Sequence, residues 1–453
     1  MAGTEAAWQL AKRGVAVRLY EMRPQVGTAV HRSELLAEMV CSNSLRSDGL
    51  DNAVGLLHEE MRRLDSLFLR TADHARVPAG KALAVDRWAF AREITATIAS
   101  LPTVELVREE VEEIPAGPCI IATGPLTSDA LGESIRSFTG ADALYFYDAI
   151  SPIVLADSID RSKTFVASRY GKGGNDYINC PMDEAQFERF LSALTSAELV
   201  KLQDFEQRLF FEGCLPIEEI AARGTQTLLF GPMKPVGLTD PRTGGRPHAV
   251  VQLRQDNLAA SHFSLVGFQT RMKWGEQERV LRLIPGLEHA EFVRFGVVHR
   301  NTYINAPRVL SETFQTRQRG DLFFAGQIAG TEGYVESAAG GLLAGIYCGM
   351  LLHEGRIEPV PRTTALGSLS FYISHASGLD YQPTNITFGI MPELGERVRG
   401  SRARREARSQ RALHDLDAWI EQVLGHLPLI PQEDVAAANH PLEGLIGSYQ
   451  ALE

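Results

Sequence analysis

The stretch from Leu322 to Gly345 constrains the fold of this chain more than any other. It begins with four apolar residues, Leu322 to Ala325, which predict a short buried strand, and a glycine-rich turn follows. The helix expected after this turn is rich in Gly and Ala, although each Gly costs a helix about 1 kcal/mol relative to Ala. We therefore expect a close approach to the helix backbone, either by a tightly packed core neighbour or by a phosphate or ring at the helix N-terminus.

The composition limits the class of protein. With 453 residues the chain exceeds a single core, and 44% hydrophobic with 22% charged residues is typical of soluble globular proteins. The net charge of −11 argues against binding of nucleic acid over the whole surface. No apolar run approaches the roughly 20 residues of a membrane span, so we expect a cytoplasmic protein without membrane contact. Five scattered cysteines, with no CxxC pair or zinc-spaced His cluster, indicate free thiols and no metal site.

The N-terminus carries part of a dinucleotide-binding motif. Thr4 to Arg13 predicts a helix, Val15 to Tyr20 predicts a strand, and the acidic Glu21 follows. In a βαβ dinucleotide-binding unit an acid at this place binds a ribose hydroxyl, and Gly3 stands where the last glycine of GxGxxG falls. A helix and a strand that end by chance at a Glu have the same pattern, so this half-motif needs support from elsewhere.

Two further glycine turns give that support. Pro118 to Ala122 predicts a buried strand that runs into Gly124, and Gly326, Gly330 and Gly333 follow the strand of the opening stretch. An FAD held across a parallel sheet explains all three glycine-containing segments, whereas NAD alone would not require the C-terminal turn. The sequence therefore predicts FAD as the cofactor.

These features predict an α/β fold in three parts. Residues 1–150 and 289–352 are expected to form one discontinuous, Rossmann-like FAD-binding domain of the two-dinucleotide-binding type. Shorter strands, aromatic residues and turns over 151–288 predict an inserted α+β domain, in which Thr227 to Phe230 reads as a strand. Residues 353–453 predict a mostly helical C-terminal tail.

Eight ordered motifs resemble those of a known family. They are MVCSNS (39–44), RVPAG (76–80), ATGPLTSDAL (122–131), FFEGCLP (210–216), LLFGPMKPVGLTDPRTG (228–244), VVQLRQ (250–255), HRNTYINAP (299–307) and GTEGYVESAAGG (330–341). The chain resembles the folate- and FAD-dependent tRNA (uracil-5-)-methyltransferases, which are relatives of GidA-type flavoproteins. The resemblance implies methylation of carbon 5 of a T-loop uridine in tRNA, with methylenetetrahydrofolate as methyl donor, FAD as cofactor and NADPH or NADH as electron source.

The resemblance also implies roles for individual residues. Carbon 5 of uracil becomes nucleophilic only after a thiolate adds to carbon 6, and a second group must then remove the carbon 5 proton. The family motifs place Cys41 and Cys214 at these two tasks. We favour Cys41 as nucleophile and Cys214 as base, with the reverse order as the alternative. His299 and Tyr334 are the candidates for holding the folate ring against the flavin.

An arginine-rich segment is a candidate for RNA contact. Seven arginines lie between Arg397 and Arg411, with Glu406 as the one acid among them. This pattern predicts either contacts to tRNA phosphates or a solvated helix face.

Three alternatives to tRNA methylation stay open. They are the same chemistry on a ribosomal uridine, a non-catalytic flavoprotein or RNA-binding remnant, and a GidA-like modifier of the wobble uridine. The paired cysteine motifs and the segment 231–238 favour methylation over the last of these. The family pattern places a strand and two glycines ahead of Met1, and on this ground we expect the chain as given to bind FAD weakly.

Overall fold

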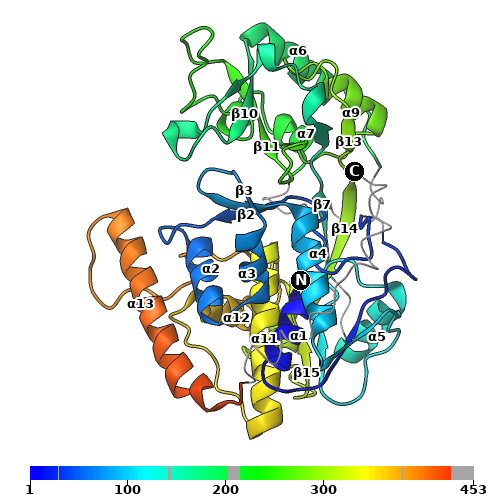
Figure 1. The fold of residues 1–453 in the computed structure, drawn as a ribbon, viewed down its shortest axis with the longest axis vertical. Coiled ribbons are helices and arrows are strands. Elements are labelled where there is room, and N and C mark those ends of the chain that lie inside the picture. The colour runs from blue at the N-terminus through cyan, green and yellow to red at the C-terminus, as the bar shows by residue number, and fades with distance from the viewer. Residues whose placement is uncertain (29, 141–143, 202–214, 380, 430–453) are drawn as a thin grey trace.

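A computed structural model describes residues 1–28, 30–140, 144–201, 215–379 and 381–429 (Figure 1). The described residues form two main hydrophobic cores. The larger core is made by residues from 2–135 and 303–427, and the second by residues from 154–290. The N-terminal and C-terminal segments thus share one body, and the middle of the chain forms the other, which lies above it in Figure 1. This arrangement agrees with the predicted α/β fold, while the predicted domain boundaries stay a prediction.

Two separate parallel strand pairs lie in the larger body. β1 (Val17–Tyr20) pairs with β5 (Val104–Val107), and β15 (Leu322–Phe324) pairs with β6 (Cys119–Ile121). The strands predicted from the apolar runs at 15–20, 118–122 and 322–325 are therefore confirmed. Because β6 and β15 come from opposite ends of the chain, their pairing fixes the C-terminal glycine turn beside the N-terminal segment.

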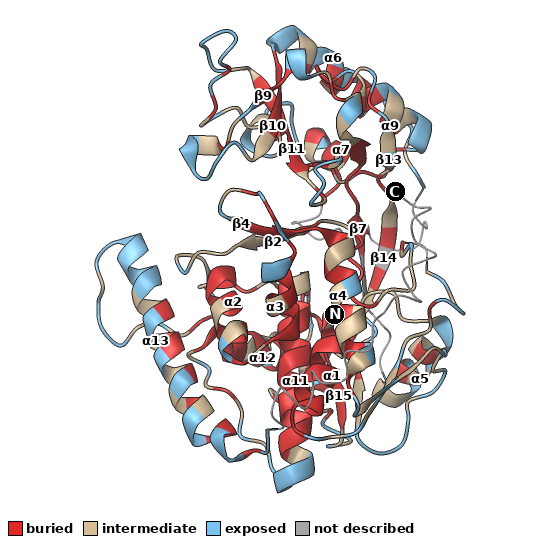
Figure 2. Ribbon diagram, in the orientation of Figure 1, coloured by how far each residue is buried: buried red, intermediate tan, exposed pale blue. Residues whose placement is uncertain are grey.

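Helix α11 (Tyr334–Glu354) is the central helix of this body, and its closest neighbour is α1 (Ala2–Ala11) (Figure 2). A Cβ added at Gly341 would lie 2.1 Å from the carbonyl oxygen of Ala2, and one added at Gly345 would lie 2.7 Å from that of Ala6. Along most of α11 the small residues thus admit a neighbouring helix, as one of the two interpretations predicts. By length and composition α11 could cross a membrane, but 89% of its apolar window is buried inside the molecule, as in a core helix.

Further helices and a small antiparallel sheet surround this pair. The helices are α2 (Ala53–Arg63), α3 (Leu67–His74), α4 (Arg87–Ser100), α5 (Asp129–Thr139), α10 (Ala306–Val309), α12 (Ala365–His375) and α13 (Ser401–Gln422). The sheet has the order β2 (Ser44–Ser47), β4 (Ala82–Val85), β3 (Arg76–Val77). The Asp86 carboxylate accepts hydrogen bonds from the backbone N–H groups of Trp88 and Ala89, both at 2.9 Å, and so begins α4 where its capping chemistry predicts. In the described part of the tail, α12 and α13 form the predicted helices.

The second body is built on a six-stranded antiparallel sheet. Its order is β13 (Phe292–Arg294), β8 (Ile153–Leu155), β12 (His262–Leu265), β11 (Ala249–Gln255), β10 (Tyr177–Met182), β9 (Phe165–Val166). Its helices are α6 (Glu184–Thr195), α7 (Ile217–Ala222), α8 (Thr227–Phe230) and α9 (Trp274–Leu281). The strand predicted at 227–230 is wrong, because so short an apolar run does not distinguish a helical turn from a strand. Only Leu228 of this turn is buried, and Phe230 is 80% exposed.

An antiparallel strand pair connects the two bodies. β7 (Leu144–Ala149) pairs with β14 (Val298–Tyr303), and Figure 1 shows this pair running from one body into the other. The pairing places His299 opposite Asp148. Residues that immediately precede β14 therefore lie at the junction, next to the end of the second sheet.

Candidate functional site

Cys41 lies at this junction and contacts the first residue of α11. Its backbone N–H donates to the Tyr334 hydroxyl at 2.8 Å, and that hydroxyl donates to the Cys41 thiol at 3.2 Å. Cys41 also packs on a small apolar cluster formed by Val30, Val40 and Ile150. The structure thus brings together a predicted catalytic thiol and a residue predicted to hold a ring.

Burial strongly affects the ionisation of this pair. Burial and the nearby carboxylate of Asp148 together raise the pKa of the Cys41 thiol to about 11, although the hydrogen bond from Tyr334 acts in the opposite direction. Burial and the neighbouring Cys41 also hold the pKa of Tyr334 well above its ordinary value. Near neutral pH both groups therefore keep their protons in the structure without ligands.

Side chains of the second body hold the loop that carries Cys41. The buried guanidinium of Arg254, on β11, donates to the Ser42 hydroxyl at 2.8 Å and to the Asn43 side-chain oxygen at 2.9 Å. The Asn43 amide nitrogen donates in turn to the carbonyl oxygens of Val85 and Gln255, both at 2.9 Å. The motif 39–44 is thus fixed between the two bodies, and its polar residues serve to position the thiol.

A buried ion pair reinforces the same junction. Arg87, the first residue of α4, donates to both oxygens of Asp256, at 2.8 and 2.6 Å, and to the backbone carbonyl of Met39 at 2.9 Å. Both side chains are nearly inaccessible, with exposed fractions of 4% and 5%. Since Asp256 directly follows β11, this pair joins the two bodies beside Cys41.

Two buried side chains on β14 lack hydrogen-bond partners among the described residues. They are His299, at Nδ1, and Asn301, at both polar atoms. Burial, opposed by the nearby Asp148, lowers the pKa of His299, so its imidazole is neutral. A buried polar group without a partner costs about 1–3 kcal/mol. These residues alternate along the strand and share one face, where a bound ligand would supply the missing partners.

The glycine turn before α11 is closely surrounded, and a side chain at its glycines would collide with neighbouring atoms. Gly326 and Gly333 have φ angles of 77° and 106°, which favour glycine. A Cβ at Gly333 would lie 2.6 Å from a carboxylate oxygen of Glu336, and that oxygen is itself buried without a partner among the described residues. The other Glu336 oxygen accepts from the guanidinium of Arg46 and from the backbone N–H of Ile386.

The remaining predicted glycines lie on or near the same parallel strands. Gly330 ends the short helical turn after β15, and a Cβ there would collide with the Tyr381 hydroxyl. Gly124 follows β6 with open space around it, and Gly3 lies in the first turn of α1, close to Ala122. Turns and helix N-termini at the carboxyl ends of parallel strands are where dinucleotides bind. These turns and helix N-termini, together with the buried polar atoms of His299 and Asn301 that lack partners among the described residues, fit an FAD.

Two predicted site residues, Glu21 and Cys214, are not placed by the structure as free site groups: Glu21 is bound to another side chain, and Cys214 is not described. The Glu21 carboxylate follows β1 as predicted, but both of its oxygens accept from the Arg23 guanidinium, at 2.9 and 3.0 Å. Although burial acts in the opposite direction, these bonds and the charge of Arg23 lower the pKa of Glu21. A ribose hydroxyl would therefore share this acceptor with Arg23. Cys214 lies outside the described residues, and its role stays a prediction.

Several residues of the site are absent from the sequence-based prediction. Glu332 and Glu336 lie inside the motif 330–341, so two acids in a glycine-rich turn were a usable signal. Burial and the charge of Asp148 raise the pKa of Glu332 well above its ordinary value. For Asp148 and Arg87 no local pattern was available, because their roles depend on contacts with distant segments.

Comparison with known proteins identifies the family of this chain. The family described as Glucose inhibited division protein A (GidA) matches residues 1–355. A relative from Pelotomaculum thermopropionicum is 58% identical over 425 residues, which is 94% of this chain and 97% of the relative. A relative from Enterococcus faecalis is 56% identical over 424 residues, with the same coverage of both chains. Both are named methylenetetrahydrofolate--tRNA-(uracil-5-)-methyltransferase TrmFO.

Solved structures agree on the fold. The form I crystal structure of Aquifex aeolicus GidA has a TM-score of 0.68 at 16% identity and covers 96% of this chain and 75% of that one. The form II crystal gives a TM-score of 0.67 at 15% identity, with 96% and 73% coverage. The fold, the motif loop at Cys41 and the glycine turn before α11 thus occur together in a chain that belongs to the GidA family and, within it, to the methylenetetrahydrofolate--tRNA-(uracil-5-)-methyltransferases.

Proposed function

We propose that this chain methylates carbon 5 of the T-loop uridine in tRNA, with methylenetetrahydrofolate as donor and NADPH or NADH as electron source, and that it acts in the cytoplasm. The observation that carries the proposal is the contact between Cys41 and Tyr334. It places a thiol at the N-terminus of α11, and β14 of the same junction carries buried polar atoms of His299 and Asn301 that have no partner among the described residues. A thiol near a helix N-terminus suits nucleophilic chemistry on a pyrimidine ring.

FAD fits the residues that surround this thiol. The glycine turn at 326–333 and the N-termini of α1 and α11 would hold it, and the faces of His299 and Tyr334 would position its ring and the folate. When bound, the flavin supplies the redox chemistry that converts a methylene unit into a methyl group. Tyr334 and Cys41 are half-buried, which limits the access of water to the reacting atoms.

The two cysteines would divide the chemistry on the uracil ring. One thiolate adds to carbon 6, which makes carbon 5 nucleophilic, and the other thiolate removes the proton from carbon 5 after methylation. Elimination of the first thiolate then restores the aromatic ring. The raised pKa of Cys41 keeps this thiol protonated at neutral pH, so Cys41 must lose its proton before it can serve either as nucleophile or as base. Both orders of the two cysteines are therefore tested below.

The proposal is tested with purified protein and defined RNA. We would incubate the chain with FAD, NADPH and methylenetetrahydrofolate, and with either a tRNA transcript or ribosomal RNA that lacks 5-methyluridine. Mass spectrometry of the nucleosides should show 5-methyluridine in the tRNA at the T-loop position. Product in ribosomal RNA alone would identify the alternative substrate, and no product in either RNA would support a non-catalytic protein.

A further inference from the structure

A stack of three aromatic rings, exposed at its outer end, lies on the second body. The Trp274 ring stacks on Phe295, with 5.7 Å between ring centroids and an angle of 15° between ring planes, and Phe295 stacks on Phe292 at 5.2 Å and 20°. Phe292 packs on the second hydrophobic core, whereas Trp274, at the outer end, is 59% exposed. An exposed Trp is unusual in this chain, since two of its other three tryptophans are buried and one is half-buried.

The stack is fixed in place and does not depend on a flexible side chain alone. One turn after Trp274, the buried amide of Gln277 donates to the Gly296 carbonyl at 2.9 Å and accepts from the Gly296 N–H at 2.7 Å. This pair of hydrogen bonds locks the start of α9 to the residue that follows Phe295. The start of α9 and the backbone after Phe295 are therefore held in a fixed relative position, and the Trp274 ring packs with one face on Phe295.

The stack is also close to the candidate site along the chain. Val297, two residues after Phe295, packs on the same apolar cluster of Val30, Val40 and Ile150 that Cys41 contacts. Two residues of extended chain span at most about 7 Å. The backbone of Phe295 therefore lies within about 7 Å of a residue that packs on this cluster, while Trp274 stays at the surface.

Two cations next to Trp274 are already paired. Lys273 forms an ion pair with Glu198, and Arg279 forms one with Glu276 at 2.6 Å. A third cation, Arg294, lies in the chain between Phe292 and Phe295 and donates to the Val30 carbonyl at 3.3 Å. Beside Trp274 itself, the surface thus offers an aromatic face. Such a face suits a nucleobase, because every base has a π-face and stacking on an aromatic side chain tolerates any sequence.

We propose that the Phe292–Phe295–Trp274 stack binds an unpaired nucleobase of the RNA, one that neighbours the uridine at Cys41. The inference rests on the proposed function, because it assumes that RNA reaches this site. A base on Trp274 would hold the strand in its unstacked form while the target uracil enters the buried site.

The test uses the full chain with FAD and a T-arm RNA hairpin, and measures the RNA dissociation constant at several salt concentrations. Trp274→Ala should weaken binding about 10-fold, the scale expected when one base stack is removed, with an unchanged salt slope, and Trp274→Phe should restore most of the affinity. The control is Phe230→Ala, which removes an exposed aromatic ring from the same body and should leave affinity unchanged. The measurement is repeated with hairpins that each lack one base of the RNA loop. At one position only, loss of the base should make the affinities of the unsubstituted chain and the Trp274→Ala variant equal.

The results separate this inference from the proposed function. Methylation of tRNA by the unsubstituted chain, with equal RNA affinity in the Trp274→Ala variant, would overturn the stacking site alone. A change in oligomeric state on Trp274→Ala, measured by light scattering, would assign the rings to a contact between subunits and would also overturn it. Absence of methylation with a position-specific loss of RNA affinity would instead contradict the proposed function and retain the stacking site.

Discussion

The hydroxyl of Tyr334 lies 3.2 Å from the thiol sulfur of Cys41 and donates to it, while it accepts the Cys41 backbone N–H at 2.8 Å. These residues are 293 positions apart, so the contact joins the N-terminal motif loop to the first turn of α11. The one hydroxyl therefore positions the thiol and lowers its pKa, in opposition to burial.

Removal of the Tyr334 hydroxyl should make Cys41 less reactive. The hydroxyl stabilises the thiolate, and a hydrogen bond to a charged group contributes about 1.5–3 kcal/mol. In the unsubstituted chain the pKa of Cys41 is raised to about 11, so its alkylation by iodoacetamide should keep accelerating with pH up to that value. Tyr334→Phe should slow alkylation at pH 8 at least 10-fold, as followed by peptide mass spectrometry. Tyr20→Phe, at an exposed tyrosine, is the control, and equal rates in both variants would contradict the assigned hydrogen bond.

Both proposed catalytic thiols should be required for methylation. Cys41→Ala and Cys214→Ala should each reduce 5-methyluridine formation by several orders of magnitude. One variant loses the group that adds to carbon 6 of the uracil, and the other loses the group that removes the proton from carbon 5. Cys180→Ala, at a buried thiol of the second core, should retain activity. If Cys41 is the nucleophile, the covalent adduct with 5-fluorouridine RNA should vanish in the Cys41 variant and persist in the Cys214 variant. The opposite pattern would assign the nucleophile to Cys214.

The buried pair of Arg87 and Asp256 should stabilise the junction between the bodies. Removing one partner of a buried ion pair leaves an uncompensated charge and costs about 3–5 kcal/mol. Asp256→Ala should lower the free energy of unfolding in urea by that amount. The matched control is Glu105→Ala, which breaks the exposed pair with Arg18 at 2.7 Å and should cost less than about 1 kcal/mol. Similar decreases in the two variants would mean that the junction pair is solvated.

A methyl group on α11 should disrupt its packing on α1. The Cβ of Gly341→Ala would lie 2.1 Å from a backbone oxygen of Ala2, and overpacking of this kind costs about 1–3 kcal/mol. The same substitution at Gly132, in α5, meets no atom within 4 Å and should stabilise its helix by up to about 1 kcal/mol. Thermal unfolding of the two variants should therefore shift in opposite directions. A higher melting temperature for Gly341→Ala would contradict the close helix contact.

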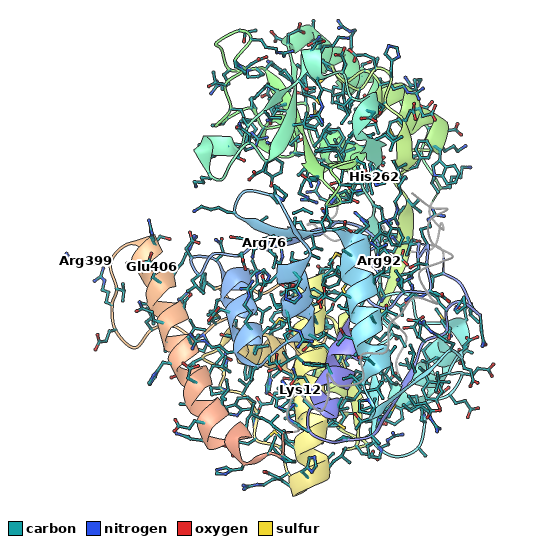
Figure 3. The ribbon with its side chains drawn as sticks, viewed as in Figure 1. Lys12, Arg76, Arg92, His262, Arg399 and Glu406 are labelled. Carbon is teal, nitrogen blue, oxygen red and sulfur yellow. The ribbon has the colours of Figure 1, made fainter. Side chains whose placement is uncertain are left out.

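The arginine-rich segment divides into internal and free side chains. Arg408 binds Glu393 at 2.5 Å and the Phe388 carbonyl at 3.0 Å, and Arg411 binds the carbonyls of Pro392 and Glu393, so these two hold a loop. In Figure 3, Arg399 lies on the loop before α13, away from the body of the molecule. Like Arg399, Arg404 and Arg405 are exposed, and no side-chain partner is found for any of the three among the described residues.

Neutralising the free arginines should therefore weaken RNA binding through electrostatics. Changing Arg399, Arg404 and Arg405 to Gln should reduce the slope of log affinity against log salt by about 1 for each phosphate that the protein no longer neutralises. FAD binding should not change. A charge-matched control changes Arg18, Arg136 and Arg356 to Gln, which removes the same charge from exposed positions elsewhere on the larger body. The salt slope of this control should stay unchanged. An unchanged slope in the first variant would assign the segment to a solvated helix face.

Local chemistry determined the elements that the sequence predicted well. Asp86 begins α4 because its side chain binds N–H groups two and three residues away, a contact that needs no tertiary information. The strand, glycine turn and helix from Leu322 to Glu354 are also encoded within one continuous stretch. Where the local signal was only four apolar residues, at 227–230, the strand prediction failed.

Tertiary structure decided how these elements form a site. Cys41, Tyr334 and His299 carry motifs of a recognisable kind, but only the fold shows that the Tyr334 hydroxyl binds the thiol and that His299 is buried without a partner at Nδ1 among the described residues. The Arg87–Asp256 pair has no sequence signal, because each charge is stable in the interior only when the other body supplies its partner. Sequence patterns report the conformational preferences of neighbouring residues, whereas burial and pKa depend on groups that distant segments bring together.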